Sequence, residues 1–474
     1  MSKTIKIDPV TRIEGHARIL LECDDSGAIS EANFCVNELR GFERILVGME
    51  ASTMPQVTAR ICGVCPTAHH LVAAKALDNA AGVELPPAAK LLREFMYMGH
   101  FIHSHSLSLF VLAGPDLVFG LNGNMATQNI VGMVDADPEL TKKGLRLRSL
   151  GQKINETIGG RGIHPVTAVA GGISFKLSDG QFQRLQELTA ESVQLVHELA
   201  QKTKTMLFDL LDANPVLLDR LNSESWYLGT VKGGKLNVYD GMLRPMDAAG
   251  ASRQEFAPEA YKEMMSERAV QNSYAKEVYL NMAGGEQMYR VGPLARINVA
   301  DGMETPLAQK EFELFKKQFS TPCHNAVLQL YAKLIELVYC CEKAHELVND
   351  PALRGEARVA ADYKGKTGIA HIEAPRGTLI HEYDIDDRGI VRAANMIIAT
   401  QQNTAAINNS LKEGANNLLK ETSDEAMLNS LEFVVRCYDP CLACSTHAIG
   451  KMALDVDISK GGRIIRRIRR NTNA

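Results

Sequence analysis

The chain has 474 residues, of which 45% are hydrophobic and 23% are charged, as is ordinary for a globular protein. Its 52 Lys and Arg residues are balanced by 56 Asp and Glu residues, which argues against a nucleic-acid partner because such proteins usually carry a basic excess. The best candidate for a membrane span, residues 107–119, is interrupted by Gly114-Pro115-Asp116, so we expect no membrane-spanning helix. The N-terminal residues lack the apolar segment of a secretory signal.

The first half of the chain predicts one hairpin followed by long helices. Residues 17–23 and 28–37 alternate in polarity around the turn sequence Asp-Asp-Ser-Gly, which indicates two antiparallel strands. A helix is expected over residues 88–112, with Pro87 in its first turn. Apolar residues at spacings of three and four predict another long helix over residues 179–211.

The second half begins with an irregular region and returns to helices. Residues 213–306 contain two glycine pairs and little periodicity, so we expect irregular structure or a small β-rich lobe. Helices are predicted over residues 306–319 and 326–347, and the second is apolar almost all round, which places it in the core. Residues 377–398 predict a hairpin that turns at 386–389, and residues 418–436 predict a mixture of loop and helix.

Ten cysteines are present, and four of them form two C-x-x-C pairs: Cys62 with Cys65, and Cys441 with Cys444. Two such turns can make a four-sulfur metal site. The turns of a zinc ribbon are roughly 15–20 residues apart, whereas 376 positions separate Cys65 from Cys441. We therefore expect a buried site that the whole domain assembles. Two unrelated structural turns, or a single redox pair, are the alternatives.

The flanks of the two pairs carry a family resemblance. Residues 59–70 read ARICGVCPTAHH and residues 439–447 read DPCLACSTH. Both resemble the signature of the large, catalytic subunit of nickel–iron hydrogenases. Further motifs of that family occur in the same order along the chain: RIEGH at 12–16, RGFE at 40–43, GRGIHPVTAVAGG at 160–172, GPLAR at 292–296, EAPRG at 373–377 and TQQN at 400–403.

The resemblance implies a fold and a domain organisation. The expected fold is mainly α with small β lobes (α+β), a long-helix bundle with β-hairpins. Residues 1–447 would form one interdependent catalytic domain. The extension at residues 448–474, which carries five arginines, would be removed during maturation by a dedicated protease that cuts between His447 and Ala448.

The resemblance also implies a function and a cofactor. The function is reversible heterolytic cleavage of H2 into protons and electrons, with the electrons passed to an iron–sulfur small subunit. The cofactor is a nickel joined to an iron that carries one CO and two cyanides. By position, Cys65 and Cys444 would bridge the two metals, and Cys62 and Cys441 would be terminal nickel ligands.

Three residues resemble those that surround the iron's small ligands. Buried cyanide nitrogens need hydrogen-bond donors, and Arg376 and Thr400 resemble those donors. Pro375 would shape the apolar wall beside CO. Without the resemblance, a structural salt bridge would be the favoured interpretation of Arg376.

Proton handling is assigned by the same resemblance. Cys441 would take the proton first, and Glu14 would relay it onward; a carboxyl in a dry site has a raised pKa, which suits a relay. An ordinary exposed loop glutamate is the alternative. Asp439 would hold the guanidinium of Arg376, which could help to polarise hydrogen, and His69 would hydrogen-bond a bridging thiolate.

A second, structural metal ion is expected. Glu43 and His447 resemble the family's ligands for Mg2+ or a similar ion, with a backbone carbonyl near Ala405 or Ala406 as the third. Oxygen ligands suit magnesium, and the histidine is less typical.

No further cysteines have iron–sulfur spacing, so the clusters are expected in a partner small subunit. The chain resembles the cytoplasmic bidirectional branch, of NAD-reducing or F420-non-reducing type. Further electron-transfer subunits would bind flavin and NAD(P), or belong to a heterodisulfide reductase or ferredoxin system. A maturation protease and nickel chaperones are the other expected partners.

Two rival functions remain for the metal analysis to separate. The related quinone-reducing subunit of respiratory complex I lacks the metal-binding cysteines. A structural protein with a four-sulfur zinc site is the second rival. Nickel and iron in equal amounts favour a hydrogenase, zinc alone favours the structural protein, and no metal favours the quinone-type relative.

Overall fold

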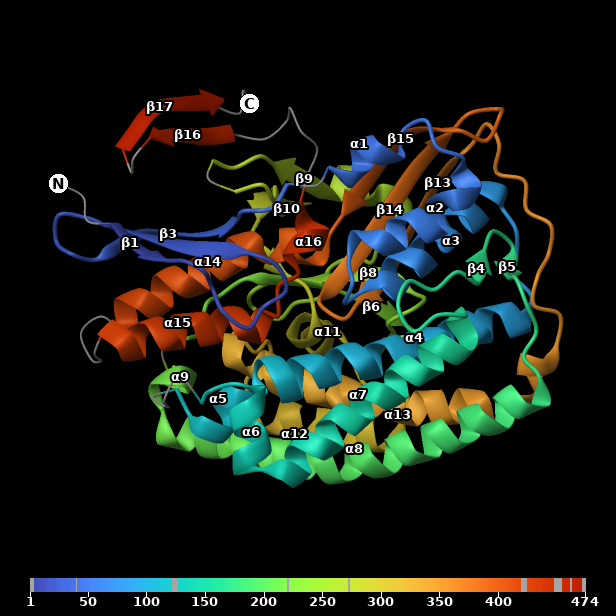
Figure 1. The fold of residues 1–474 in the computed structure, drawn as a ribbon, viewed down its shortest axis with the longest axis horizontal. Coiled ribbons are helices and arrows are strands. Elements are labelled where there is room, and N and C mark those ends of the chain that lie inside the picture. Colours follow the sequence, from blue (N-terminus) through green and yellow to red (C-terminus); the bar gives the residue numbers. More distant parts are fainter. Residues whose placement is uncertain are drawn as a thin grey trace.

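Four long helices pack together as a bundle, in which each contacts two of the others: α4 (Pro87–Leu107), α7 (Pro138–Gly159), α8 (Asp179–Ala213) and α13 (Gln329–Val348) (Figure 1). They are seen in a computed structural model that describes residues 4–39, 41–121, 127–219, 221–271, 273–418, 424–446, 454–460 and 463–470. A capping box starts α8, in which the Ser178 hydroxyl accepts from the backbone N–H of Gln181 and the Gln181 side chain accepts from that of Ser178.

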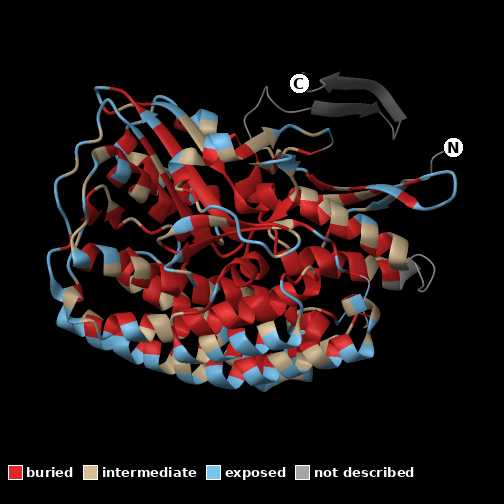
Figure 2. Cartoon of the chain, turned by 180° about the vertical axis from the view of Figure 1, so that it is seen from behind, coloured by how far each residue is buried: buried red, intermediate tan, exposed pale blue. Residues whose placement is uncertain are grey.

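The pattern of apolar residues in each long helix matches the faces that the structure buries. Residues along nearly all of α13 are buried, as its uniform apolarity predicts, whereas α7 and α8 bury one face and expose the other (Figure 2). The helix expected over residues 88–112 ends its regular part at Leu107, and a π-helical segment covers Ser108–Leu112. Helix α12 (Pro306–Gln318) confirms the other helical prediction.

Three of the longer helices were not predicted, nor were the short ones. The three longer helices are α3 (Pro66–Ala81), α7 and α14 (Ala399–Leu418). Most of α3 is buried, so it lacks the polar face that reveals an amphipathic helix. In α14, Asn and Gln side chains bind the backbone of other segments; such residues resemble a loop in the sequence because they are weak helix formers.

Two antiparallel sheets flank the site. Strands β1 (Thr4–Ile7), β2 (Ala17–Cys23) and β3 (Ile29–Val36) form the first, and β13 (Thr367–Ala374), β14 (Gly377–Ile385) and β15 (Val391–Ile397) the second. Both predicted hairpins are confirmed, and β13 was not predicted. Helix α3 packs on β13 and β14.

Residues 213–306 contain a small β-rich lobe, the second of the two alternatives. Strands β6 (Trp226–Lys232), β7 (Lys235–Leu236), β8 (Met242–Met246) and β12 (Tyr289–Arg290) form one sheet, and β9 (Met265–Arg268), β10 (Glu277–Met282) and β11 (Gly285–Gln287) another. A separate buried cluster that includes Leu228, Val278 and Ile397 joins this lobe to β15.

The remaining elements are short or lie near the C-terminus. Helix α15 (Asp424–Tyr438) is followed by α16 (Leu442–Ser445), and the two described strands beyond them, β16 (Leu454–Lys460) and β17 (Arg463–Arg470), form a hairpin. Among the described residues, no helix is both long enough and apolar enough to cross a membrane. The short elements are α1 (Phe42–Leu46), α2 (Met54–Thr58), α5 (Gly114–Phe119), α6 (Ile130–Ala136), α9 (Val216–Asp219), α10 (Tyr261–Met264), α11 (Pro293–Val299), β4 (Ala168–Val169) and β5 (Gly172–Ile173).

Candidate metal centre

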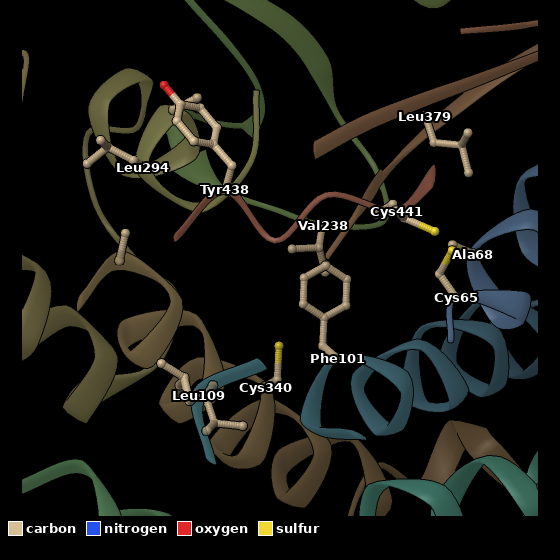
Figure 3. Packing of buried hydrophobic residues seen from close by; sticks show 14 of the residues in the cluster. Cys65, Ala68, Phe101, Leu109, Val238, Leu294, Cys340, Leu379, Tyr438 and Cys441 are labelled. Carbon is tan, nitrogen blue, oxygen red and sulfur yellow. The ribbon is translucent and has the colours of Figure 1, made fainter. Parts of the chain in front are cut away.

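The two C-x-x-C pairs meet, as the sequence predicts. The four sulfur atoms of Cys62, Cys65, Cys441 and Cys444 all lie within 4.8 Å of one another, and all four residues are buried. The shortest separation between the two pairs is 3.1 Å, from Cys65 Sγ to Cys444 Sγ. Figure 3 shows Cys65 and Cys441 approaching each other beside Leu379. Four soft sulfurs in this arrangement fit a nickel, iron or zinc site.

The first pair is held by the turn that precedes α3. The backbone N–H groups of Val64 and Cys65 both point to Cys62 Sγ, at 3.2 Å and 3.4 Å. Cys65 is the residue just before α3, and Pro66 occupies the first turn of that helix. A sulfur at a helix N-terminus lies near the positive end of the helix dipole, which stabilises a thiolate.

The second pair is held by α14 and by the N-terminal loop. The backbone N–H of Cys441 donates to Thr400 Oγ1 at 2.8 Å. The segment of Glu14 runs beside Cys441 as an isolated β-bridge, and the backbone N–H of Leu442 donates to the Glu14 carbonyl. The two ends of the chain and α14 thus build this half of the site together.

The four thiols differ in their readiness to ionise. Burial raises the pKa values of Cys441 and Cys444 well above their ordinary value. Hydrogen bonds from the other three sulfurs instead hold the pKa of Cys62 well below it. The two cysteine pairs therefore differ in their electrostatic environment. A soft cation that replaced the thiol protons would be held by four thiolates, so its binding releases protons.

Pro375 and Arg376 form the two-residue turn between β13 and β14, where Ala374 pairs with Gly377. The buried Arg296 of the GPLAR motif supports this turn: its guanidinium donates to the carbonyl of Ala374 at 3.0 Å and to that of Pro375 at 3.1 Å. The motif thus positions the turn without itself reaching the sulfurs. Glu336 and Glu373 neutralise Arg296.

Arg376 is bound to Asp439, as the resemblance implies. Its Nε donates to the Asp439 carbonyl oxygen at 2.5 Å, and its Nη2 donates to Asp439 Oδ1 at 3.0 Å. Burial raises the pKa of the Asp439 carboxyl, but Arg376 and Lys333 outweigh burial, so the pKa lies below its ordinary value. The third nitrogen, Arg376 Nη1, is buried without a hydrogen-bond partner among the described atoms.

A small cavity opens between the sulfurs and this turn. Its wall includes Cys65, Arg376 and Thr400, and apolar groups complete it: Ala374, Pro375, Leu379, Ile398 and Ala399. A polar nitrogen without a partner beside apolar side chains is costly unless something binds there. The donor set and the orphan nitrogen therefore fit a metal centre that carries small, hydrogen-bond-accepting ligands.

His69 reaches one of the sulfurs, and two residues that the sequence did not reveal extend the contact. His69 Nε2 lies 3.5 Å from Cys444 Sγ, and His69 Nδ1 lies 3.1 Å from His381 Nε2. His381 Nδ1 is 2.6 Å from the Tyr383 hydroxyl. Burial lowers the pKa of His69 to about 4, so the ring is neutral and has a single N–H.

The Tyr383 hydroxyl determines which ring nitrogens of His381 and His69 carry a proton. When the Tyr383 hydroxyl donates to His381, the other nitrogen of His381 must donate to His69, and the N–H of His69 then points to Cys444. His381 and Tyr383 lie two positions apart on β14, so their side chains face the same side of the strand. This spacing could have indicated that the two side chains act together.

Glu14 lies beside the second cysteine pair. Its Oε2 accepts from the backbone N–H of Ala443 at 3.0 Å. Burial, followed by the charge of Cys62, raises the pKa of Glu14 above its ordinary value. The side chain is only partly buried, so it stands between the sulfurs and the outside.

The residues expected to hold the second ion are described only in part. Glu43 lies on α1, and its Oε1 accepts from the backbone N–H of Met396 at 3.1 Å. Ala405 and Ala406 lie on α14. His447 lies outside the described residues, as does Arg40 of the RGFE motif. The magnesium site therefore stays a prediction.

Comparison with known proteins agrees with the geometry. The model of the nickel-dependent hydrogenase family matches residues 40–143 and 214–447, and a HoxL-like model matches residues 4–39. The chain belongs to the nickel-dependent hydrogenase family. The expected family and enzyme class, a nickel–iron hydrogenase large subunit, are confirmed.

Individual relatives support this assignment over nearly the whole chain. One subunit of the F420-non-reducing hydrogenase vhu of Methanococcus voltae is 40% identical, over 88% of this chain and 99% of the relative. The NAD-reducing hydrogenase HoxS subunit beta of Cupriavidus necator is 35% identical, over 98% and 99%. A crystal structure of an NAD+-reducing NiFe-hydrogenase in the H2-reduced state is 34% identical and has a TM-score of 0.88, over 94% of this chain and 99% of that one. The expected α+β fold of long helices with small sheets is thereby confirmed.

Proposed function

We propose that this hydrogenase subunit cleaves H2 reversibly into protons and electrons at a nickel–iron centre and passes the electrons to an iron–sulfur small subunit. The observation that carries the proposal is the meeting of four buried sulfurs from distant parts of the chain. Arg376, with its orphan nitrogen, stands beside them. A structural zinc site would have no need of that nitrogen.

Each cysteine has a proposed role at the centre. All four would hold the centre, Cys65 and Cys444 as ligands shared by nickel and iron and Cys62 and Cys441 as ligands of nickel alone. The bound centre would supply metals that polarise H2 and accept its electrons, with one CO and two cyanides on the iron. Arg376 and Thr400 would donate to the cyanides, and Pro375 with Leu379 would form the apolar wall beside CO; all four line the small cavity.

Proton transfer is proposed to pass from Cys441 to Glu14. Cys441 would take the proton first, since it belongs to the second cysteine pair and its segment runs directly beside that of Glu14. Glu14 is the nearest carboxyl of the RIEGH loop and contacts the turn after Cys441. Burial raises its pKa above the ordinary value, which suits a carboxyl that accepts and then releases a proton.

Glu14→Gln tests this route. The variant keeps the shape of the side chain and an acceptor for the Ala443 N–H but removes the ionisable group. General acid–base catalysis typically contributes about 100-fold or more, so H2 oxidation should fall by at least that factor while the nickel and iron contents stay unchanged. Glu14→Asp is the matched control and should retain more activity. Unchanged oxidation in Glu14→Gln would exclude Glu14 from the route.

The partners and the electron acceptor are also proposed. An iron–sulfur small subunit is needed because the remaining described cysteines are buried singly or lie side by side in α13. The named relatives include NAD-reducing and F420-non-reducing hydrogenase subunits. We therefore propose a flavin and NAD(P) module, or a heterodisulfide reductase or ferredoxin system, as the further acceptor, in the cytoplasm.

Maturation is proposed to remove residues 448–474 and leave a catalytic domain of residues 1–447. A protease would cut after His447 once nickel chaperones have loaded the site, and His447 would then join Glu43 at the magnesium ion. The intact mass of the active enzyme checks this. A full-length chain with nickel and full activity contradicts it.

Metal analysis tests the main proposal. The complex, produced with its partners, should contain nickel and iron in equal amounts, should oxidise H2 and should show infrared bands of CO and cyanide. Cys62→Ser and Cys441→Ser should abolish activity and reduce the nickel content, whereas Cys340→Ala, a buried cysteine of α13, should retain both. Zinc alone in the wild-type protein would overturn the proposal.

A further inference from the structure

A buried lysine of α13 has no function among the roles assigned so far. Lys333 lies in the second turn of α13 and has only 1% of its surface exposed. Its Nζ lies 2.6 Å from Ser108 Oγ and 3.2 Å from Asp439 Oδ2. Burying an ammonium group costs several kcal/mol even when it has partners, so a residue of this kind needs a reason.

The partners of Lys333 connect it to the metal centre. Asp439 is the residue whose other oxygen, Oδ1, binds Arg376 Nη2 at 3.0 Å. Asp439 is therefore shared between two cations, one on each oxygen. Ser108 is the first residue of the π-helical segment after α4, and such segments often occur at functional sites. Its hydroxyl gives the ammonium a second partner beside Asp439.

The charges of Arg376, Asp439 and Lys333, taken together, do not sum to zero. Arg376 and Lys333 contribute two positive charges, and Asp439 contributes one negative charge, which leaves a net charge of +1. The neighbouring buried cluster has the opposite balance, because Arg296 is paired with both Glu336 and Glu373. The positive excess therefore belongs to the group that faces the sulfurs.

The four cysteines are the natural counter-charge. Arg376 interacts electrostatically with Cys441, Cys65 and Cys62. A carboxylate that neutralised Arg376 alone would cancel most of that attraction. By drawing on the same carboxylate, Lys333 leaves the positive charge of Arg376 less compensated on the side of the thiolates.

We propose that Lys333 is a positioning residue of the metal centre. It acts through Asp439: it fixes the carboxylate that orients Arg376 and supplies the positive charge that balances the thiolates. The inference rests on the proposed nickel–iron centre. It differs from a packing role because it depends on the charge of the side chain and not on its volume.

Lys333→Met tests the inference, since methionine fills a similar volume without the charge. The variant should still load nickel and iron. The CO and cyanide bands should move to lower wavenumber, because loss of a nearby positive charge leaves more electron density on the iron. H2 oxidation should fall at least tenfold. Lys333→Gln can keep hydrogen bonds to Ser108 and Asp439 without the charge, and it should shift the bands in the same direction.

Lys204→Met is the matched control. Lys204 is largely buried on α8 and binds both oxygens of Glu311 at 2.9 Å, but it belongs to the outer helices. Its loss should leave the bands unchanged. If Lys333→Met fails to load metal, the bands of Lys333→Gln decide the question.

Each outcome has one meaning. Loaded Lys333→Met or Lys333→Gln with unshifted bands would overturn the inference and leave a packing role, while the proposed function would stand. Wild-type enzyme that lacks CO and cyanide bands would instead contradict the proposed cofactor. Bands that also shift in Lys204→Met would show a general effect of instability and overturn the inference.

Discussion

Asp116 is the side chain that fastens the loop of Glu14 to the helices. Its carboxylate is fully buried and binds two arginines: Arg12 Nη2 at 2.6 Å from Oδ1, and Arg436 Nε at 2.9 Å from Oδ2. Arg12 has a positive φ of 55°, which costs free energy unless the surroundings hold it. The ion group therefore links the N-terminal loop, α5 and α15 beside the metal centre.

Asp116→Asn should destabilise the protein strongly. Both arginines keep their charge but lose their shared counter-ion, and breaking a buried ion pair costs about 3–5 kcal/mol. Urea unfolding measures the loss. Asp135→Asn, at an exposed position of α6, is the control and should change stability by less than about 0.5 kcal/mol. A wild-type unfolding curve for Asp116→Asn would contradict this account.

Gly377 makes the turn between β13 and β14 possible. Its φ is +140°, in the region that favours glycine. A Cβ atom there would lie 2.2 Å from Val291 Cγ2 and 2.9 Å from the backbone nitrogen of Gly292. The glycine thus allows the strand carrying Arg376 to approach the segment that leads into the GPLAR helix.

Gly377→Ala should displace this turn. Backbone strain and overpacking together should cost about 2–4 kcal/mol, and H2 oxidation should fall because Arg376 moves with the turn. Gly389→Ala is the control: its φ is +85°, and the nearest atoms to a new Cβ are 3.7 Å away, on Lys364. It should lose some stability but keep full activity per folded enzyme. Full activity in Gly377→Ala would contradict the argument.

Glu94 gives the contact of α4 with its neighbours a pH dependence. Burial is the main cause that raises its pKa to about 7. The negative charges of Glu304 and Asp240 also raise the pKa, whereas the positive charges of Lys343 and Lys232 lower it. The folded state therefore holds the proton to a higher pH than the unfolded state, whose pKa is near 4.5. The stability from this group is full below about pH 4.5 and is lost as the pH rises through 7.

Glu94→Gln should flatten that dependence. The variant cannot ionise, so it should gain stability relative to the wild type as the pH rises from 5 to 8. Chemical unfolding at several pH values, without change of salt, measures the difference. Glu187→Gln, at an exposed position of α8, provides the comparison curve. Parallel curves for Glu94→Gln and the wild type would show that Glu94 does not control this range.

Elements with strong periodicity could be predicted from the sequence, whereas those defined by tertiary contacts could not. The alternation around Asp24-Asp25 identified β2 and β3, and the stripe of α8 identified its full length. In contrast, most of α3 is buried and it lacks an amphipathic stripe. The role of Lys333 depends on Ser108 and Asp439, which lie 225 and 106 positions away. Its signal, a charge inside a helix predicted to be buried, was present in the sequence.

The metal centre closes the molecule on itself. The two halves come from the turn before α3 and from the segment between α15 and α16, and α14 and the N-terminal loop hold the second half in place. The cysteine spacing predicted this closure. Strand alternation could have paired His381 with Tyr383, but only the fold shows that this pair reaches His69 and that Arg296 supports the β13–β14 turn, because both depend on strand register and on the path of that turn.

Metal loading should stabilise the whole molecule. A centre bound by both cysteine pairs ties residues 62–65 to residues 441–444 and binds the folded state alone. Loaded protein should therefore unfold at a higher temperature than metal-free protein and should resist cleavage near α16. Calorimetry and limited proteolysis measure these effects. Cys62→Ser/Cys441→Ser, grown with and without nickel, should show no such difference; equal stability of loaded and metal-free wild type would contradict the prediction.

The separation of the two cysteine pairs along the chain also affects when the site can form during synthesis. During synthesis, Cys62 and Cys65 emerge 379 and 376 residues before Cys441. At about 5–20 residues per second, they wait on the order of 20–75 s for the other half of their site. A nearby pair of thiols that lacks its partners can oxidise to a disulfide. The growing chain therefore depends on a reducing environment, or on a protein that covers this turn, long before there is a complete site for any metal to enter.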